Sequence, residues 1–310
     1  MKVLVTGGAG FIGSNFVSRS IATRSDIQIT VLDALTYAGD KRNLEEVSSQ
    51  IEFVHGDIRD ARLVDSLVAD SDLVVHFAAE SHNDNSLKRP QVFIDTNVMG
   101  TFNLVQAAAE NKTRFHHIST DEVFGDLALD STEKFTRDSP YRPSSPYSAS
   151  KAASDHLVRA WCRSFGLRAT ISNCSNNFGL HQHSEKLIPK IIEALLQGNR
   201  PQIYGTGLNV RDWIHVDDHT DGIWAVLDYG TIGQTYLLGA NQELTNLEVV
   251  GIIASALGKE GTEVEFIRDR PGHDRRYAID TSNVFEELGW KASKSMSIET
   301  VAPLISEIAG

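Results

Sequence analysis

Five residues between positions 120 and 151 carry side chains that could transfer protons. Thr120, Asp121 and Glu122 are consecutive, and they follow an apolar run that ends in Phe-His-His-Ile-Ser. Tyr147 and Lys151 are four residues apart, so on a helix they would lie on one face, one turn from each other. A nearby ammonium group favours the phenolate, so this pair would lower the pKa of the tyrosine. Two acids, a hydroxyl and an activated phenol indicate proton chemistry in more than one step.

Two predicted elements position these side chains. The run 114–119 is typical of a buried strand, whose end delivers residues 120–122, and an Ala-rich helix follows Pro143 and Pro146, which disfavour helix before them. Each signal also has a simpler explanation. Adjacent acids after a strand often cap a helix or lie in a solvated loop, and a Tyr–Lys pair at this spacing occurs by chance on many helices. The rest of the chain has to decide between these interpretations.

Composition restricts the classes of partner. The 310 residues suffice for one large domain or two unequal ones, and 41% hydrophobic and 23% charged residues are typical of a globular protein. A net charge of −12 argues against nucleic acid or an anionic membrane surface. No apolar run has transmembrane length, the N-terminus is typical of a strand and not of a signal peptide, and Cys162 and Cys174 suggest no disulfide framework. We therefore expect a cytoplasmic protein.

A glycine-rich turn near the N-terminus predicts a dinucleotide site. Between a predicted strand (2–6) and a predicted helix (14–22) lie glycines at positions 7, 10 and 13. Such glycines let the backbone approach a pyrophosphate, which the helix N-terminus then stabilises. A glycine motif alone could be a tight turn, but a second strand (28–32) ends in Asp33, twenty residues after Gly13. An acid there accepts hydrogen bonds from a ribose 2′-hydroxyl and repels a 2′-phosphate, which favours NAD over NADP.

Strands alternate with helices along the first half of the chain. Further strands are predicted at 51–55, 73–77 and 167–173, and a long helix at 90–110. This alternation predicts an α/β fold with a doubly wound, Rossmann-like parallel sheet and a smaller mixed α/β lobe that binds substrate. We assign residues 1–173, with 214–239 returning, to the NAD-binding domain, and residues 174–213 and 240–310 to the lobe.

Several motifs together resemble the extended short-chain dehydrogenase/reductase family and, within it, the dTDP-glucose 4,6-dehydratases. The resemblance spans essentially the whole chain and is carried by Tyr147-x-x-x-Lys151 and by the segments 6–13, 32–39, 119–123, 174–177, 185–189, 210–213 and 269–274. The chain departs from the family's usual pattern at Asn83 and Asn85 (commonly Val and Arg), at Phe124 (usually Tyr) and at 180–184. These departures concern substrate contacts more than the type of reaction.

The resemblance implies a role for each of the five residues. Tyr147 would take the proton of the C4 hydroxyl of a nucleotide hexose, Lys151 would hold the nicotinamide ribose, and Thr120 would bond O4. Oxidation at C4 makes the C5 hydrogen acidic, so Glu122 would remove it while protonated Asp121 donates to the departing C6 hydroxyl. The hydride would return to C6, giving dTDP-4-keto-6-deoxyglucose and regenerating tightly held NAD.

Strand ends and the resemblance also assign the binding residues. The predicted cofactor contacts are Gly7, Gly10, Phe11, Ile12, Gly13, Asp33, Ala34, Leu35, Thr36, Asp57, Ile58, Phe77, Ala78, Ala79, Ser81, Thr96, Tyr147, Lys151 and Asn177. The predicted substrate contacts are Ser81, Thr120, Asn176, Lys186, Leu187, Tyr204, Arg211, Asn246, Arg270 and His273. An arginine fork at position 211 suits a diphosphate, although a structural ion pair with Asp212 or Asp217 would also explain it. No metal site is expected, because no acid or cysteine completes one with His181 and His183.

Three other functions stay open beside dehydration of dTDP-glucose. A dehydratase of a UDP- or GDP-hexose is the nearest, since Asn83 and Asn85 leave room for another nucleotide. A 4-epimerase is disfavoured because it has no use for an acid–base pair at C5 and C6. A non-catalytic NAD-sensing regulator would require loss of the acid–base set, which is present. The resemblance further implies a homodimer that pairs through helices at 93–110 and 147–165.

Overall fold

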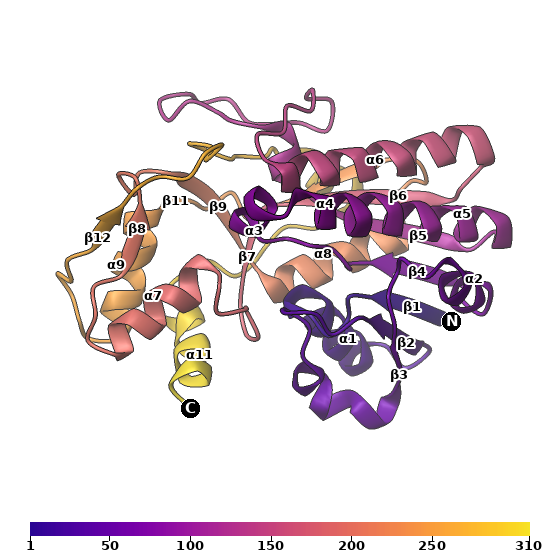
Figure 1. The fold of residues 1–310 in the computed structure, drawn as a ribbon, viewed down its shortest axis with the longest axis horizontal. Helices are drawn as coiled ribbons and strands as arrows, with labels where there is room; N and C mark the ends of the chain where they lie inside the picture. The colour runs from indigo at the N-terminus through magenta and orange to yellow at the C-terminus, as the bar shows by residue number, and fades with distance from the viewer.

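The computed structural model describes all 310 residues and has two bodies side by side, joined by several chain crossings (Figure 1). The larger body is built on a seven-stranded sheet, in the order β10-β6-β5-β4-β1-β2-β3, in which every neighbouring pair is parallel. Its strands are β1 (Lys2–Thr6), β2 (Gln28–Asp33), β3 (Ile51–His55), β4 (Leu73–His76), β5 (Arg114–Thr120), β6 (Ala169–Cys174) and β10 (Thr235–Leu238). The predicted doubly wound α/β fold is confirmed.

Helices cover both faces of this sheet because its strands are apolar on both sides. Val3 and Val5 of β1 belong to one core, with Phe16 and Trp224, whereas Leu4 belongs to the opposite core. This division follows from the strand period of two. The first face carries α1 (Phe11–Thr23), η1 (Lys41–Gln50) and α8 (Val216–Tyr229), and the second carries α2 (Ala61–Ala69), α5 (Thr101–Asn111) and α6 (Pro146–Phe165).

The smaller body combines two short sheets with helices around a third core. Strands β7 (Asn176–Phe178), β9 (Val210–His215) and β11 (Glu243–Thr245) form one sheet with parallel and antiparallel pairs, and β8 (Gln202–Tyr204) pairs with β12 (Glu265–Ile267). Its helices are α7 (Leu187–Leu196), α9 (Asn246–Ala256) and α11 (Ile298–Ala309). Within the stretch assigned to the lobe, α10 (Ser282–Leu288) packs instead on β10 and α8 of the larger body.

Some element boundaries differ from those predicted. The helix predicted at 90–110 consists of α4 (Pro90–Phe93), a π-helical turn η2 (Ile94–Gly100) and α5. Helix α1 begins at Phe11 and not at Ser14, because the extended backbone of Gly10 already supplies its N-cap. Two further short helices, α3 (Asn83–Lys88) and the 3₁₀ turn η3 (Asp121–Phe124), follow β4 and β5. No helix combines the length and the apolarity needed to cross a bilayer.

Candidate active site

The predicted dinucleotide turn has a backbone that only glycine permits. Gly7 has φ of +72°, and a Cβ there would lie 2.5 Å from the backbone nitrogen of Ala78. A Cβ on Gly13 would lie 2.2 Å from the carbonyl oxygen of Gly7. Helix α1 has no side-chain N-cap and no acid in its first turn, so the chain leaves its first N–H groups to another acceptor. This cradle fits a pyrophosphate.

Asp33 lies beside that turn, at the end of β2. Its side chain is buried, and its two carboxylate oxygens accept hydrogen bonds from the backbone N–H of Ala9 (2.9 Å) and of Leu35 (2.8 Å). Leu35 takes a left-handed backbone conformation with φ of +49°, which turns the predicted contacts 34–36 around the carboxylate. The acid is therefore fixed by backbone donors, and its remaining lone pairs suit ribose hydroxyls.

Other predicted cofactor contacts already have partners within the chain. Asp57 is paired with the guanidinium of Arg59 at 2.7 Å. The side chain of Asn177 accepts from His219 at 2.8 Å and donates to the carbonyl oxygen of Ser175 at 3.0 Å. These contacts fix both side chains at the carboxyl edge of the sheet.

Asn97 is a positioning residue that was not among the predicted contacts, although its neighbour Thr96 was. It is buried in η2, and its amide bonds both the N–H and the carbonyl of Glu80, at 2.8 and 2.9 Å. The same amide donates to the hydroxyl of Ser150 on α6 at 2.8 Å. Asn97 thus ties the segment after β4 to the helix that carries Tyr147. The π-helical turn is a signal typical of functional sites, but it appears only in the structure.

The end of β5 presents the predicted catalytic acids. The Thr120 hydroxyl accepts from the backbone N–H of Glu122 at 3.2 Å, which caps η3, and it lies 3.4 Å from Oδ1 of Asp121. On the neighbouring α6, a capping box between Ser145 and Ser148 starts the helix directly beside Tyr147. The structure therefore brings the two predicted groups of proton-transfer residues to one place.

Lys151 is held by a polar network beneath the site. Its ammonium donates to the carbonyl oxygen of Ile118 at 2.7 Å, and burial lowers the pKa of Lys151 to about 8. It also lies 3.5 Å from His117, whose other neighbour is the carboxylate of Asp155 at 3.2 Å. The Tyr141 hydroxyl donates to Asp155 at 2.6 Å. Burial alone would raise the pKa of Asp155, but His117 and Lys151 hold it at about 2.

His117 and Asp155 were missed as functional residues. A weak signal exists for Asp155, because positions 147, 151 and 155 repeat at a spacing of four and so share a helix face. His117 has no comparable signal, since a histidine in a buried strand is as readily explained by packing.

The expected lowering of the pKa of Tyr147 by Lys151 is wrong for the chain by itself. Burial, followed by the charge of Glu122, raises the pKa of Tyr147 well above its ordinary value. The physical reason is desolvation, which disfavours the phenolate, while the ammonium of Lys151 is directed to the carbonyl of Ile118.

Asp121 and Glu122 are consecutive but have different surroundings. Asp121 is 1% exposed, and burial, then the charges of Glu122 and Asp212, raise its pKa well above the ordinary value. Glu122 is only partly buried, and it accepts a hydrogen bond from the side-chain amide of Asn83 at 2.9 Å. One carboxyl is therefore placed to hold a proton and the other to accept one.

Three predicted substrate contacts converge on residues 81–84, and a fourth packs against one of them. Lys186 donates to the carbonyl oxygen of Ser81 at 3.1 Å, and the Tyr204 hydroxyl donates to Asp84 at 2.9 Å. Arg270 lies 3.4 Å from the same carboxylate, and the ring of His273 meets that of Tyr204 edge-on, with centroids 6.1 Å apart. The smaller body therefore contacts the carboxyl edge of the large sheet through these side chains.

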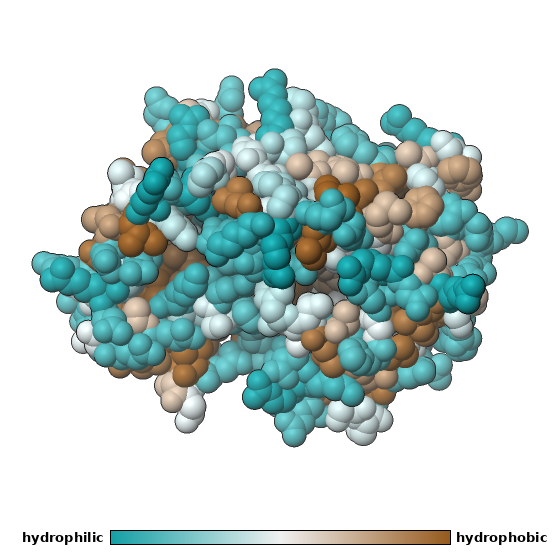
Figure 2. Space-filling model, in the orientation of Figure 1, coloured by the Kyte–Doolittle hydropathy of each residue, from teal (hydrophilic) through white to brown (hydrophobic).

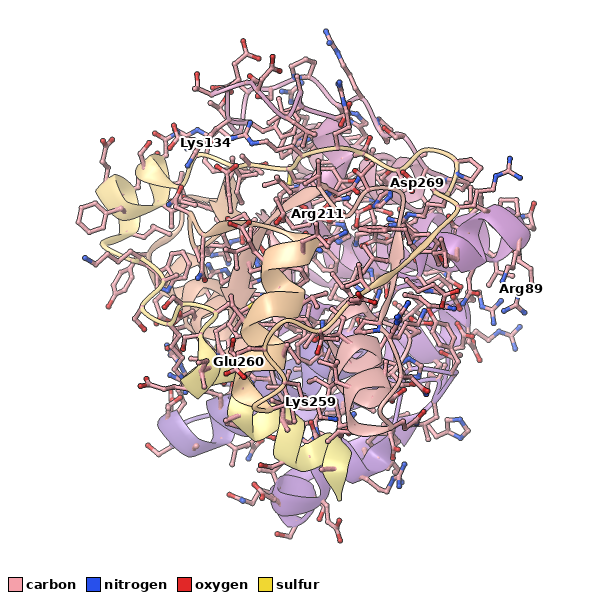
Figure 3. The ribbon with its side chains drawn as sticks, turned by 90° about the vertical axis from the view of Figure 1, so that its left-hand side faces the viewer. Arg89, Lys134, Arg211, Lys259, Glu260 and Asp269 are labelled. Atoms are coloured by element: carbon pink, nitrogen blue, oxygen red, sulfur yellow. The ribbon has the colours of Figure 1, made fainter.

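Arg211 is buried in the smaller body and is not in an ion pair with Asp212 or Asp217. Its guanidinium donates to the backbone carbonyls of Val210 (2.8 Å) and Asp274 (2.9 Å) and lies over the ring of Tyr277. Figure 3 shows it in the interior, while Asp269 lies on the long loop that follows β12. The structural ion pair is thus excluded in this structure, and the predicted role in binding a diphosphate stays a prediction.

Four buried polar atoms of Asn83 and of predicted site residues have no partner within the chain. They are Oδ2 of Asp121, Oδ1 of Asn83, Oδ1 of Asn176 and Nε of Arg270. Unpaired buried polar atoms are costly, so these four are open to a polar ligand. Asn246 and Leu187 are the first residues of α9 and α7, and Asn246 is buried. Phe124 packs among the rings of Phe135 and Tyr141.

The chain is similar in sequence to dehydratases of nucleotide sugars. The family model described as GDP-mannose 4,6 dehydratase matches residues 4–302. The dTDP-glucose 4,6-dehydratase of Mycolicibacterium smegmatis is 56% identical over 94% of this chain and 88% of its own length, and dTDP-glucose 4,6-dehydratase 1 of Escherichia coli is 46% identical over 95% and 89%. The dTDP-glucose 4,6-dehydratase of Streptomyces venezuelae, solved with NAD bound, is 45% identical, with a TM-score of 0.94 over 99% of this chain and 96% of that one.

Proposed function

The chain belongs to the GDP-mannose 4,6 dehydratase family, and on that premise we propose that it dehydrates dTDP-glucose to dTDP-4-keto-6-deoxyglucose with NAD as cofactor. The observation that carries this function is the pair of unlike carboxyls at the end of β5, next to Tyr147. A 4-epimerase works at C4 alone and has no use for such a pair. The intact acid–base set also disfavours a regulator without activity.

The five residues at the site divide the reaction between them. Tyr147 takes the proton of the C4 hydroxyl, which the Thr120 hydroxyl helps to orient. A C4 ketone makes the C5 hydrogen acidic, and Glu122, partly exposed and already bonded as an acceptor, removes it. Asp121, whose pKa burial raises well above its ordinary value, donates its proton to the departing C6 oxygen.

The proton balance gives Thr120 a second role. After one turnover Glu122 has returned its proton to C5, but Tyr147 has gained a proton and Asp121 has lost one. One proton must therefore pass from Tyr147 to Asp121 before the next turnover. The Thr120 hydroxyl lies 3.4 Å from Oδ1 of Asp121 and is close enough to Tyr147 to lower its pKa, so we place it on the route between the two groups.

The residues around the glycine turn fit NAD. The uncapped start of α1 and the glycines at 7 and 13 would hold the pyrophosphate, and Asp33 would accept from the adenosine ribose. Bound NAD supplies the hydride acceptor at C4 and the hydride donor at C6, so it is not consumed. Because burial raises the pKa of Tyr147, this residue needs a positive charge beyond that of Lys151 to act as a base.

The nucleotide of the substrate is inferred from the relatives and not from the family description. That description prints GDP-mannose, whereas proteins 56% and 46% identical over nearly the whole chain are named for dTDP-glucose. We infer that Asn176, Lys186, Arg211, Asn246 and Arg270 hold the nucleotide sugar.

Turnover of three substrates tests this function. The purified protein is incubated with dTDP-glucose, UDP-glucose or GDP-mannose, and the near-ultraviolet absorbance that 4-keto-6-deoxy sugars develop in alkali is followed. We expect product from dTDP-glucose at the highest kcat/KM. Turnover of only UDP- or GDP-sugars would refute the substrate, and no product from any of them would refute the activity.

We also propose a homodimer that pairs through η2, α5 and α6. Ile94, Met99 and Phe165 on these elements are 43%, 49% and 61% exposed, and hydrophobic side chains gather over α4 and α5 in Figure 2. Exposed apolar groups of this kind are typical of an interface. A light-scattering mass equal to that of a single chain would contradict the dimer.

The division of the chain and its compartment are proposals as well. We propose that residues 1–173 and 214–239 form the NAD-binding unit and that most of the remainder binds the sugar nucleotide. The two free cysteines, Cys162 and Cys174, are in keeping with the reducing cytoplasm, which we propose as the compartment.

A further inference from the structure

Asn83 joins two segments that are far apart in the sequence. It is the first residue of α3, and its Nδ2 donates to Oε2 of Glu122, 39 residues further along the chain, at 2.9 Å. Its own Oδ1 is buried and has no partner within the chain. Asn83 is also a position at which the sequence departs from the pattern it resembles. The departure therefore makes direct contact with the residue assigned to C5.

The chemistry of an amide decides what this contact does. An ionised carboxylate only accepts hydrogen bonds, so the nitrogen of the amide has to face it. Such a charge-assisted bond favours the ionised form of the carboxyl and fixes its orientation. No other side chain donates a hydrogen bond to the Glu122 carboxylate. The bond between Glu122 and Thr120 is made by the backbone N–H of Glu122 and does not involve its carboxylate.

The neighbouring acid makes this preference important. Asp121 and Glu122 are consecutive, and the negative charge of Glu122 disfavours ionisation of Asp121. A site with two close carboxyls holds one proton more readily than none, and their environments decide which of them carries it. The donor side chain of Asn83 contacts Glu122 and not Asp121.

We propose that Asn83 is a positioning residue, whose amide orients the Glu122 carboxylate as the C5 base and leaves proton donation to Asp121. The kinetic consequences of this inference rest on the proposed dehydration. The contact between Asn83 and Glu122 does not, because it exists in the chain without substrate.

Asn83→Leu removes the donor at nearly constant size, and Asn83→Ala is a second variant in case the first folds poorly. Losing a hydrogen bond to a charged group is expected to lower kcat about 10-fold or more, with KM changed less than about twofold. Incorporation of solvent deuterium at C5 should slow in parallel, because Glu122 exchanges that proton, whereas reduction of bound NAD by dTDP-glucose should be unchanged.

Gln202→Met is the matched control, since it removes an exposed side-chain amide of the smaller body that donates to a glutamate, Glu265, at 2.9 Å. Its kcat and its rate of C5 exchange should match those of the unmodified protein. If Asn83→Leu and Asn83→Ala also retain both, Asn83 has no positioning role and the proposal is overturned. A lower kcat with an unchanged rate of C5 exchange would likewise overturn it, because that outcome indicates only a packing defect.

A measurement without turnover separates this inference from the proposed function. In protein labelled with ¹⁵N, the side-chain amide resonance of Asn83 is identified by its loss in Asn83→Leu. Glu122→Gln should shift this resonance, because it replaces the carboxylate that accepts the hydrogen bond, whereas Glu265→Gln in the smaller body should leave it in place. An unshifted resonance overturns the role of Asn83 even if dTDP-glucose is turned over. A shifted resonance in a protein that does not turn over dTDP-glucose supports the role and refutes only the substrate.

Discussion

Asp33 and Asp121 occupy equivalent places at the carboxyl edge of one sheet and are surrounded differently. Asp33 is the last residue of β2, and its two oxygens accept hydrogen bonds from the backbone N–H groups of Ala9 and Leu35. Asp121 follows β5, with one oxygen 3.4 Å from the Thr120 hydroxyl and the other without a partner. Both side chains are almost fully buried. Two buried carboxyls at one edge of the sheet therefore differ in the donors that face them.

This difference separates a binding acid from a reacting one. Backbone donors at fixed positions stabilise a permanent negative charge, as a ribose-binding residue requires. Few donors and a second carboxyl nearby favour the neutral form, as a proton donor requires. The same fold supplies both, because every parallel strand delivers its end to one edge.

Replacing Glu122 tests the reacting carboxyls at the end of β5 and should have the largest effect. Glu122→Gln keeps the size and polarity of the side chain but cannot take the C5 proton, so dehydration should fall by about 10²–10⁴-fold. Reduction of bound NAD by dTDP-glucose should persist, because Tyr147 and Lys151 are unchanged. Absorbance of reduced cofactor in a single turnover measures this directly, and normal formation of the 4-keto product would contradict the role of Glu122.

Replacing Asp33 tests the binding acid at the end of β2. Asp33→Ala removes an acceptor for the ribose and leaves two backbone N–H groups without a partner, so affinity for NAD should fall about 10-fold or more. Titration of the protein freed of cofactor gives the dissociation constant. Asp57→Ala is a control at the end of the next strand, whose carboxylate is already paired with Arg59. An equal loss in both variants would remove the distinction that we draw for Asp33.

Replacing Asp155 should have a smaller effect, because this residue acts through the polar network that holds Lys151. The pKa of Lys151 is about 8, lowered by burial and supported by the charge of Asp155, so activity that needs the ammonium is lost as pH rises through this value. Asp155→Asn removes that support and should move the basic limb of the kcat–pH profile to lower pH by about half a unit or more. Tyr141→Phe removes a bond to Asp155 but not its charge, so its basic limb should move less. Identical limbs in all three proteins would contradict the network.

The smallest expected effect concerns stability. Asp121 has a raised pKa in the folded chain, so the folded state binds a proton that the unfolded state loses above its ordinary pKa of about 4. Stability is therefore lost as pH rises from that value through the raised one. Asp121→Asn has no carboxyl at this position and so does not lose stability in this way. Its Tm should equal that of the unmodified protein near pH 4 and lie a few degrees above it at pH 7. A difference that does not depend on pH would indicate that Asp121 is ionised when folded.

The strands could be predicted because each is a short apolar run whose end carries a recognisable group, such as Gly7 or Asp33. The acid–base set could also be predicted, because its members are close in sequence or at helical spacing. Asn83, Asn97 and His117 were beyond prediction as functional partners. Their contacts join residues 39, 17 and 38 positions apart, Asn83 with Glu122, Asn97 with Glu80 and His117 with Asp155. Such pairings depend on how the strands are ordered in the sheet.

The raised pKa of Tyr147 shows a second limit. Helical spacing correctly places Lys151 one turn away, but it does not reveal that the ammonium is directed to the carbonyl of Ile118. Nor does the spacing reveal complete burial, which dominates the pKa of the phenol. Proximity along a helix predicts a face and not the direction of a long side chain.

The position of α10 has a consequence for how this molecule can be engineered and how it can diversify. The chain enters the smaller body after β6, returns at α8, leaves again after β10, and sends α10 back to the large sheet before it ends in α11. Val284 of α10 belongs to the large core, and Val301 of α11 belongs to the small one. A cut near residue 280 would therefore damage both cores at once. Neither body forms a cassette that can be exchanged, so new substrate preferences have to arise by local substitution within the shared scaffold.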